Sequence, residues 1–166
     1  MSSVNINSIR VPAREFFSDT GSSHIHSLVN FRRGVVSGRH VLGFRLPAFQ
    51  RHRVWDIEQS RAFIDSVYRG RNIGCYVFNI SMNDDMHDLL IDGQQRMSAI
   101  QDYVNDVFGI AGEDGVMHMY SELTQGEQAS FLRISFPYLA LHIDDMDKLK
   151  DAYTRMNFAG THHVLK

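Results

Sequence analysis

The apolar pattern of the chain changes its period at Asp92-Gly93, and this change constrains the fold more than any other feature of the sequence. The short run at residues 88–91 predicts a buried β-strand. From Gln94 onward the apolar residues recur at helical spacing, at Met97, Ile100 and Val104. The sequence therefore predicts a strand that passes through a glycine turn directly into the N-terminus of a helix.

Two interpretations of this turn are open from the local pattern alone. In the first, the helix N-terminus and Arg96 bind an anion, and the amides of Gln94 and Gln95 orient a water or contact a base or ribose. This arrangement is typical of a phosphate site. In the second, Asp92 merely caps the helix, and Gln94, Gln95 and Arg96 form its solvated first turn.

The other patterns predict a single α+β domain, with an N-terminal arm and helix over residues 1–40 and the main unit over residues 41–166. We expect the arm to be extended through Thr20, with a short strand at Val4–Ile9, and the first helix to be capped by Ser22 and Ser23 and to end near Gly34. Further strands are expected at Val41–Leu46, Ile73–Ile80, Asp88–Ile91, Val116–Tyr120 and Phe136–Ile143, and further helices at 56–70, 94–108, 124–133 and 147–158. Capping boxes support two of these helices, Asp56 with Gln59 and Thr124 with Glu127.

The segment Pro47–Trp55 is polar and arginine-rich, but apolar residues interrupt it. We interpret it as a loop that is anchored to the core, with Trp55 as the anchor. A base-stacking role for Trp55 is the alternative.

The charge of the chain is unevenly distributed. Residues 1–75 contain 11 arginines, no lysine and 5 acidic residues, whereas residues 76–166 contain 6 basic and 14 acidic residues. Arginine binds phosphate or carboxylate bidentately, so the basic half indicates either phosphate recognition or pairing with the acidic half within one fold. A net charge of −2 argues against general coating of nucleic acid.

Composition excludes several classes of protein. The single cysteine, Cys75, excludes an intramolecular disulfide framework and an all-cysteine zinc site, and its apolar neighbours predict a buried, inert thiol. No apolar run approaches the roughly 18 residues of a membrane span, and the N-terminus lacks a cleavable export signal. We therefore expect a cytoplasmic protein with no membrane partner.

Five segments, in the same order along the chain, resemble one family. It is the ParB/sulfiredoxin-like family with an Asp-Gly-Gln-Gln-Arg motif, which forms the N-terminal domain of GmrSD-type modification-dependent restriction enzymes and of the phosphorothioate-sensing defence protein SspE. The segment 90–96 matches the signature itself, and 46–55 resembles the Pro-x-(aromatic)-Gln-Arg-x-x-x-Trp box. The segment 63–70 resembles the family's apolar-Asp-Ser helix. The segment 72–74 resembles its Pro-Ile-Gly strand entry, with Asn72 in place of proline. The segment 153–161 resembles its closing Arg-(apolar)-Asn-x-x-Gly-Thr segment.

The resemblance implies a ParB/sulfiredoxin-like α+β fold that binds and hydrolyses a nucleoside triphosphate, with Mg²⁺, to control a nuclease. It implies that Gly93 and Arg96 hold phosphate, that Asp92 orients the turn or a metal-bound water, and that Gln94 and Gln95 place water or a phosphate oxygen. The catalytic residues would be Asp92, Gln94, Gln95 and Arg96. Further nucleotide-binding residues would be Gln50, Arg51, Arg53, Arg155, Asn157, Thr161 and His162. Hydrolysis is less firmly implied than binding, because Asp92 is the only carboxylate in the signature.

Three hypotheses of function follow. The first is a nucleotide-binding regulatory domain of restriction, phage defence or counter-defence, without a nuclease domain of its own and able to form a homo-oligomer. The second is a ParB-like DNA-binding module, whose binding would weaken steeply with salt. The third is a non-catalytic protein that binds a nuclease or another defence protein and modulates it.

Overall fold

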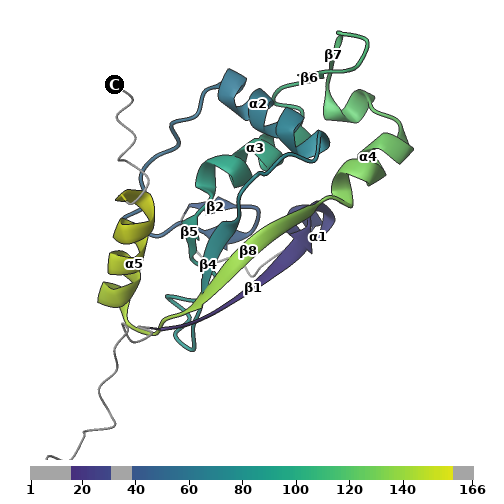
Figure 1. Ribbon diagram of the computed structural model, residues 1–166. Coiled ribbons are helices and arrows are strands. Elements are labelled where there is room, and N and C mark those ends of the chain that lie inside the picture. Colours follow the sequence, from purple (N-terminus) through teal and green to yellow (C-terminus); the bar gives the residue numbers. More distant parts are fainter. Residues whose placement is uncertain (1–15, 31–38, 159–166) are drawn as a thin grey trace, which may run out of the picture.

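The computed structural model describes residues 16–30 and 39–158, and its centre is a mixed four-stranded sheet in the order β1-β8-β4-β5 (Figure 1). The strands are β1 (Phe17–His24), β8 (Ser135–His142), β4 (Tyr76–Ile80) and β5 (Leu90–Asp92). The central pair β4 and β8 is parallel, and both outer pairs are antiparallel. Together with the helices, this sheet confirms the predicted α+β class.

Helices cover both faces of the sheet. Side chains alternate between the faces along each strand, so a strand with consecutive apolar residues has apolar side chains to bury on both faces. On β4, Tyr76 and Phe78 pack into one core, and Val77 between them packs into the other. The first core lies against α1 (Ile25–Asn30), α2 (Ile57–Tyr68) and α3 (Gln94–Val104), whereas the second lies against α5 (Met146–Phe158). Figure 1 shows α5, in yellow, at one side of the sheet and away from α2 and α3.

The remaining elements are short. A two-stranded hairpin joins β2 (His40–Val41) to β3 (Phe44–Arg45), and a second joins β6 (Ile110–Ala111) to β7 (Met117–His118). A 3₁₀ turn at Tyr120–Glu122 leads into α4 (Gln125–Leu132). Both predicted capping boxes are present, at Asp56 with Gln59 and at Thr124 with Glu127. No helix in the described part of the chain has the length and apolar character needed to cross a bilayer.

The structure corrects three local predictions. Ser22 and Ser23 do not cap a helix but belong to β1, which pairs with β8 over its whole length. Residues that were expected in the N-terminal arm therefore form an edge of the main sheet. The predicted strand Val41–Leu46 is a hairpin, because Leu42 and Gly43 adopt positive φ angles of 45° and 80°. The strand expected at Val4–Ile9 and the helix end near Gly34 lie outside the described residues.

The third correction concerns Cys75, which is exposed and not buried. It follows Gly74, which has a φ of +70°, and it precedes Tyr76, the first residue of β4. The thiol therefore lies at the surface just before the strand enters the core.

Candidate functional site

The turn between β5 and α3 has the predicted form. Gly93 is the N-cap of α3 with φ of 101°, and no side chain caps the helix there. A Cβ atom at Gly93 would lie 2.9 Å from the Cβ of Tyr76, so the turn has no room for a side chain. The interpretation of Asp92 as a helix cap is therefore wrong, because the N-cap is Gly93, which has no side chain to accept a hydrogen bond.

Arg96 is held in place by both of its terminal nitrogens. Nη1 donates to the carbonyl of Ile73 at 3.1 Å, and Nη2 donates to Asp92 Oδ2 at 3.0 Å. The side chain is only 18% exposed, against 42% for that of Asp92. A Cβ at Gly74 would lie 2.5 Å from Nη1, so this glycine makes the space that Arg96 occupies. These contacts fix the side chain of Arg96, so the interpretation of Arg96 as a solvated residue of the first turn is wrong.

Gln95 joins the turn to the upstream loop. Its Oε1 accepts hydrogen bonds from the backbone N–H groups of Val54 and Trp55, each at 3.1 Å. Trp55 is half-buried, and its ring lies 5.7 Å from that of Phe63 on α2. These contacts confirm that the segment Pro47–Trp55 is an anchored loop and that Trp55 packs against the core.

Gln94 and Gln50 differ from Gln95, because both are buried and the side-chain oxygen of each lacks a hydrogen-bond donor among the described residues. Each is only 7% exposed, and the Oε1 atom of each is inaccessible and accepts no hydrogen bond from the described residues. A buried amide without partners is unfavourable by about 1–3 kcal/mol, so native proteins rarely retain one. Both oxygens belong to residues that line one cavity, and as acceptors they could be satisfied there by a donor such as water or a ligand hydroxyl.

Both amides line a cavity of about 170 Å³, here called the motif cavity. Its wall has three parts: the turn and first residues of α3, the Gln50 loop, and one face of α5. The lining residues are Gln50, Arg51, Trp55, Asp92, Gly93, Gln94, Gln95, Arg96, Tyr153 and Asn157. The five residues of the signature thus meet the upstream box and the C-terminal helix in one place.

The structure brings together most of the predicted site residues but not all. Gln50, Arg51 and Asn157 join the signature at the motif cavity. Arg53 instead pairs with Asp102 of α3, and Arg155 pairs with Asp151 at 2.8 Å one turn earlier on α5. Neither lines the motif cavity. Thr161 and His162 lie outside the described residues.

Tyr153 is a cavity residue that sequence reasoning missed. Its ring packs against Phe49 with centroids 5.0 Å apart, and its hydroxyl accepts a long hydrogen bond of 3.4 Å from the Arg51 N–H. Tyr153 and Asn157 are spaced i, i+4, and so they share one face of α5. That spacing is the sequence signal that could have placed Tyr153 at the site together with Asn157.

Comparison with known families identifies the family of the chain. The family model described as GmrSD restriction endonuclease, N-terminal domain, matches residues 28–157, which is most of the chain. The chain belongs to this family. No curated protein and no solved structure matches it in the other two comparisons.

The motif cavity of this chain is lined by one carboxylate that could contact a metal. Asp92 is the only acidic residue of its lining, and in the described ranges no three metal-ligating side chains gather into a cluster. Mg²⁺ is commonly held by one or two carboxylates together with substrate phosphates and water. If a nucleotide bound here together with Mg²⁺, Asp92 would be the lining residue able to contact the metal, and Mg²⁺ would neutralise charge on the phosphates.

Proposed function

We propose that this GmrSD-type domain binds a nucleoside triphosphate by its phosphates in the motif cavity and thereby regulates a restriction or phage-defence activity in the bacterial cytoplasm. One observation carries the proposal: a single cavity is lined by Arg51, which has no ion pair within the described residues, by the side-chain-free helix N-terminus at Gly93, and by the amides of Gln50 and Gln94.

Arg51 supplies the free positive charge. Its guanidinium makes no ion pair or hydrogen bond with any residue in 16–30 or 39–158, and its side chain is exposed at the cavity. Arg96 is already engaged with Asp92 and Ile73, so it contributes local charge but few free donors. A phosphate that approaches the cavity would therefore pair with Arg51 and with the free N–H groups at the start of α3.

The size of the motif cavity limits how much of the ligand it encloses. At about 170 Å³ it is smaller than the 300–1,000 Å³ of pockets that surround a drug-sized ligand. We infer that it encloses one part of the nucleotide and that the rest lies outside. The amides of Gln50 and Gln94 can donate to phosphate oxygens and accept from water or hydroxyl groups.

Hydrolysis is a second step for which the support is weaker. Phosphoryl transfer needs charge neutralisation and an oriented water more than a covalent group. The unpartnered amides of Gln50 and Gln94 could orient such a water, but Asp92, the only lining carboxylate, is already paired with Arg96. The arrangement therefore supports binding more strongly than turnover.

A thermal-shift experiment tests the proposal. The wild type is melted with ATP, GTP, CTP or UTP, each with Mg²⁺, and compared with Arg51→Ala and with Arg155→Ala as a matched control. A ligand at a hundredfold excess over its Kd adds about 2.7 kcal/mol to the free energy of unfolding. We expect at least one nucleotide to stabilise the wild type and Arg155→Ala but not Arg51→Ala. Absence of a shift with every nucleotide, or equal shifts in the two variants, would contradict the proposal.

A further inference from the structure

A second cavity, of about 810 Å³ and here called the tyrosine cavity, shares no lining residue with the motif cavity. Its walls are formed by the end of α2, Tyr103 of α3, the β6–β7 hairpin and α4 with the residues before it. Its volume lies within the range of about 300–1,000 Å³ that is typical of pockets for small organic molecules. The size of the cavity therefore suits a ligand of that kind.

Tyr68 and Tyr103 give this cavity an aromatic wall with an unused hydrogen-bond donor. Their hydroxyl groups lie 3.0 Å apart, and either can donate to the other. Each phenol carries one O–H, so this contact uses one hydrogen and leaves the second without an acceptor in the described part of the chain. Tyr103 is buried, whereas Tyr68 is exposed although its ring packs against Phe131. The half-buried side chains of Ile110 and Leu123 also line the cavity. This wall fits a ligand that is largely apolar and carries an acceptor oxygen.

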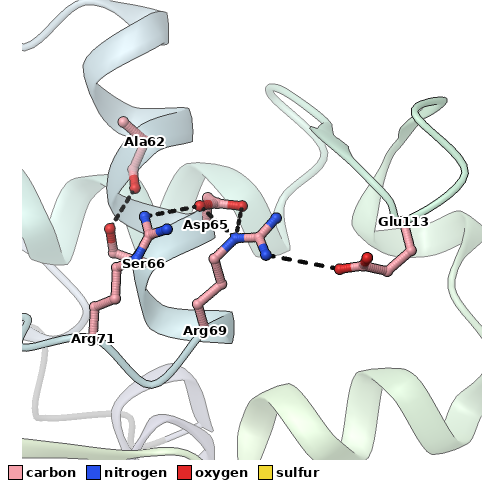
Figure 2. Close-up of polar contacts among 6 residues, drawn as sticks. All are labelled: Ala62, Asp65, Ser66, Arg69, Arg71 and Glu113. Atoms are coloured by element: carbon pink, nitrogen blue, oxygen red, sulfur yellow. Dashed lines mark hydrogen bonds and ion pairs between the residues drawn. The ribbon is translucent and has the colours of Figure 1, made fainter.

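Positive charge is in excess at the end of α2, which Figure 2 shows. Arg69 Nε donates to both oxygens of Asp65 at 2.9 Å, and Arg71 Nη1 donates to Asp65 Oδ2 at 3.4 Å, so one carboxylate serves two arginines. Neither terminal nitrogen of Arg69 donates a hydrogen bond to residues 16–30 or 39–158. Glu113 lies 3.8 Å from Arg69 Nη1, but its side chain is 96% exposed, so this ion pair is weak. A ligand carboxylate can therefore replace Glu113 and bind both terminal nitrogens of Arg69.

Negative charge is available at the start of α4. Glu127 Oε2 accepts from the backbone N–H and the hydroxyl of Thr124, at 2.8 and 2.9 Å, and Glu127 forms no salt bridge with an arginine or lysine of the described residues. These hydrogen bonds hold the pKa of Glu127 below its ordinary value, so the carboxylate is charged at neutral pH. His118 also lines the cavity, and its Nε2 contacts Asp114 at 2.9 Å. Arg133, just after α4, forms no ion pair within the described ranges.

We propose that the tyrosine cavity binds a small zwitterion with an apolar side chain, which is the chemistry of a free apolar amino acid or dipeptide. The ligand carboxylate binds Arg69 and the unused tyrosine hydroxyl, and its ammonium group binds Glu127. Its side chain packs against Tyr68 and Leu123. An anion would leave Glu127 without a cation, and a cation would leave the terminal nitrogens of Arg69 without an acceptor. The proposal does not depend on the motif cavity, because the two cavities have separate linings.

Two matched pairs of substitutions test the charged contacts. Glu127 and Glu122 each accept from the backbone N–H of a helix cap, a role that glutamine can keep, but only Glu127 lines the cavity. Glu127→Gln is therefore compared with Glu122→Gln. Arg69→Gln and Arg71→Gln each leave Asp65 with one arginine, but only Arg69 lines the cavity. Melting temperatures verify that all four variants are folded.

Calorimetric titration with phenylalanine and with the dipeptide leucyl-phenylalanine measures binding. Each ligand is also used in an N-acetylated form, which lacks the ammonium group, and in a C-terminally amidated form, which lacks the carboxylate. We expect at least one of the two zwitterions to bind the wild type about tenfold more tightly than its acetylated and amidated forms. The relative affinities of phenylalanine and the dipeptide show which of the two sources of this chemistry the cavity prefers.

Glu127→Gln should weaken binding of the zwitterion by about tenfold without weakening that of the acetylated form, because the acetylated form has no ammonium group to lose a partner. Arg69→Gln should likewise weaken binding of the zwitterion and not that of the amidated form. Glu122→Gln and Arg71→Gln should bind the zwitterion as the wild type does. Absence of binding by both zwitterions, equal affinity for the singly charged forms, or equal effects within either pair of variants would overturn the proposal.

Discussion

Gln95 accepts a hydrogen bond from the backbone N–H of Trp55 across 3.1 Å, and this contact fastens the first turn of α3 to the loop before α2. Its neighbour Gln94 is buried in the wall of the same cavity, and its amide oxygen accepts no hydrogen bond from the described residues. The two glutamines of the signature therefore have different tasks. Gln95 positions the loop, and Gln94 is available to a ligand.

Leucine substitutions separate these tasks, because leucine is apolar and lacks the hydrogen-bonding amide of glutamine. Gln95→Leu removes the acceptor of two N–H groups and should lower the free energy of unfolding by about 1–2 kcal/mol. Gln94→Leu removes an unpartnered buried oxygen, so stability should be unchanged or higher, while the nucleotide-induced shift falls. Urea unfolding with and without nucleotide measures both. Equal destabilisation by the two substitutions would refute the division.

Gly74 offers a test of the clamped arginine. Gly74 and Gly70 both have positive φ, at +70° and +65°, but a Cβ at Gly74 would meet Arg96 Nη1 at 2.5 Å, whereas at Gly70 it would meet nothing within 4 Å. Both alanine variants should lose about 1–2 kcal/mol of stability through backbone strain. Only Gly74→Ala should also displace Arg96 and weaken nucleotide binding. If Gly70→Ala weakens binding as much, the glycine does not act through Arg96.

The hydroxyl groups of Tyr68 and Tyr103 lie 3.0 Å apart, and burial raises the pKa of both above the ordinary value of 10.0. The folded state then holds these protons more tightly than the unfolded state. This contribution to stability is complete below pH 10 and decreases as the pH rises above it. Urea midpoints between pH 8 and 11 should fall less steeply for Tyr68→Phe than for the wild type, and parallel profiles would contradict the assignment.

Local sequence was sufficient where local interactions decide the structure. The capping box of Asp56 and Gln59 begins α2, and the glycine turn at Gly93 begins α3, where each was predicted. Ser22 and Ser23 have the same local preference for a helix cap, but pairing with β8, more than a hundred residues later, places them in a strand. Such long-range pairing leaves no trace in a local pattern.

The same limit applies to the site. Arg51 and Arg53 are two residues apart and alike in sequence, but Arg53 reaches Asp102 on α3, while Arg51 lies at the motif cavity and has no ion pair with any residue that the structure describes. Which arginine is free depends on a carboxylate about fifty residues away. The family resemblance identified the segments that meet. Only the fold shows that Arg51 faces the cavity and that Arg53 instead pairs with Asp102.

The most direct test of the account is a calorimetric titration of a nucleoside triphosphate, with the parent nucleoside as the control ligand, into the wild type, Arg51→Ala and Arg155→Ala. The account predicts that the triphosphate binds the wild type and Arg155→Ala with similar Kd and binds Arg51→Ala at least tenfold more weakly, a loss of about 1.4 kcal/mol. The nucleoside, which lacks phosphates, should bind far more weakly to all three. Equal affinity for triphosphate and nucleoside, or full triphosphate affinity in Arg51→Ala, would contradict the claim that Arg51 and the motif cavity bind phosphate.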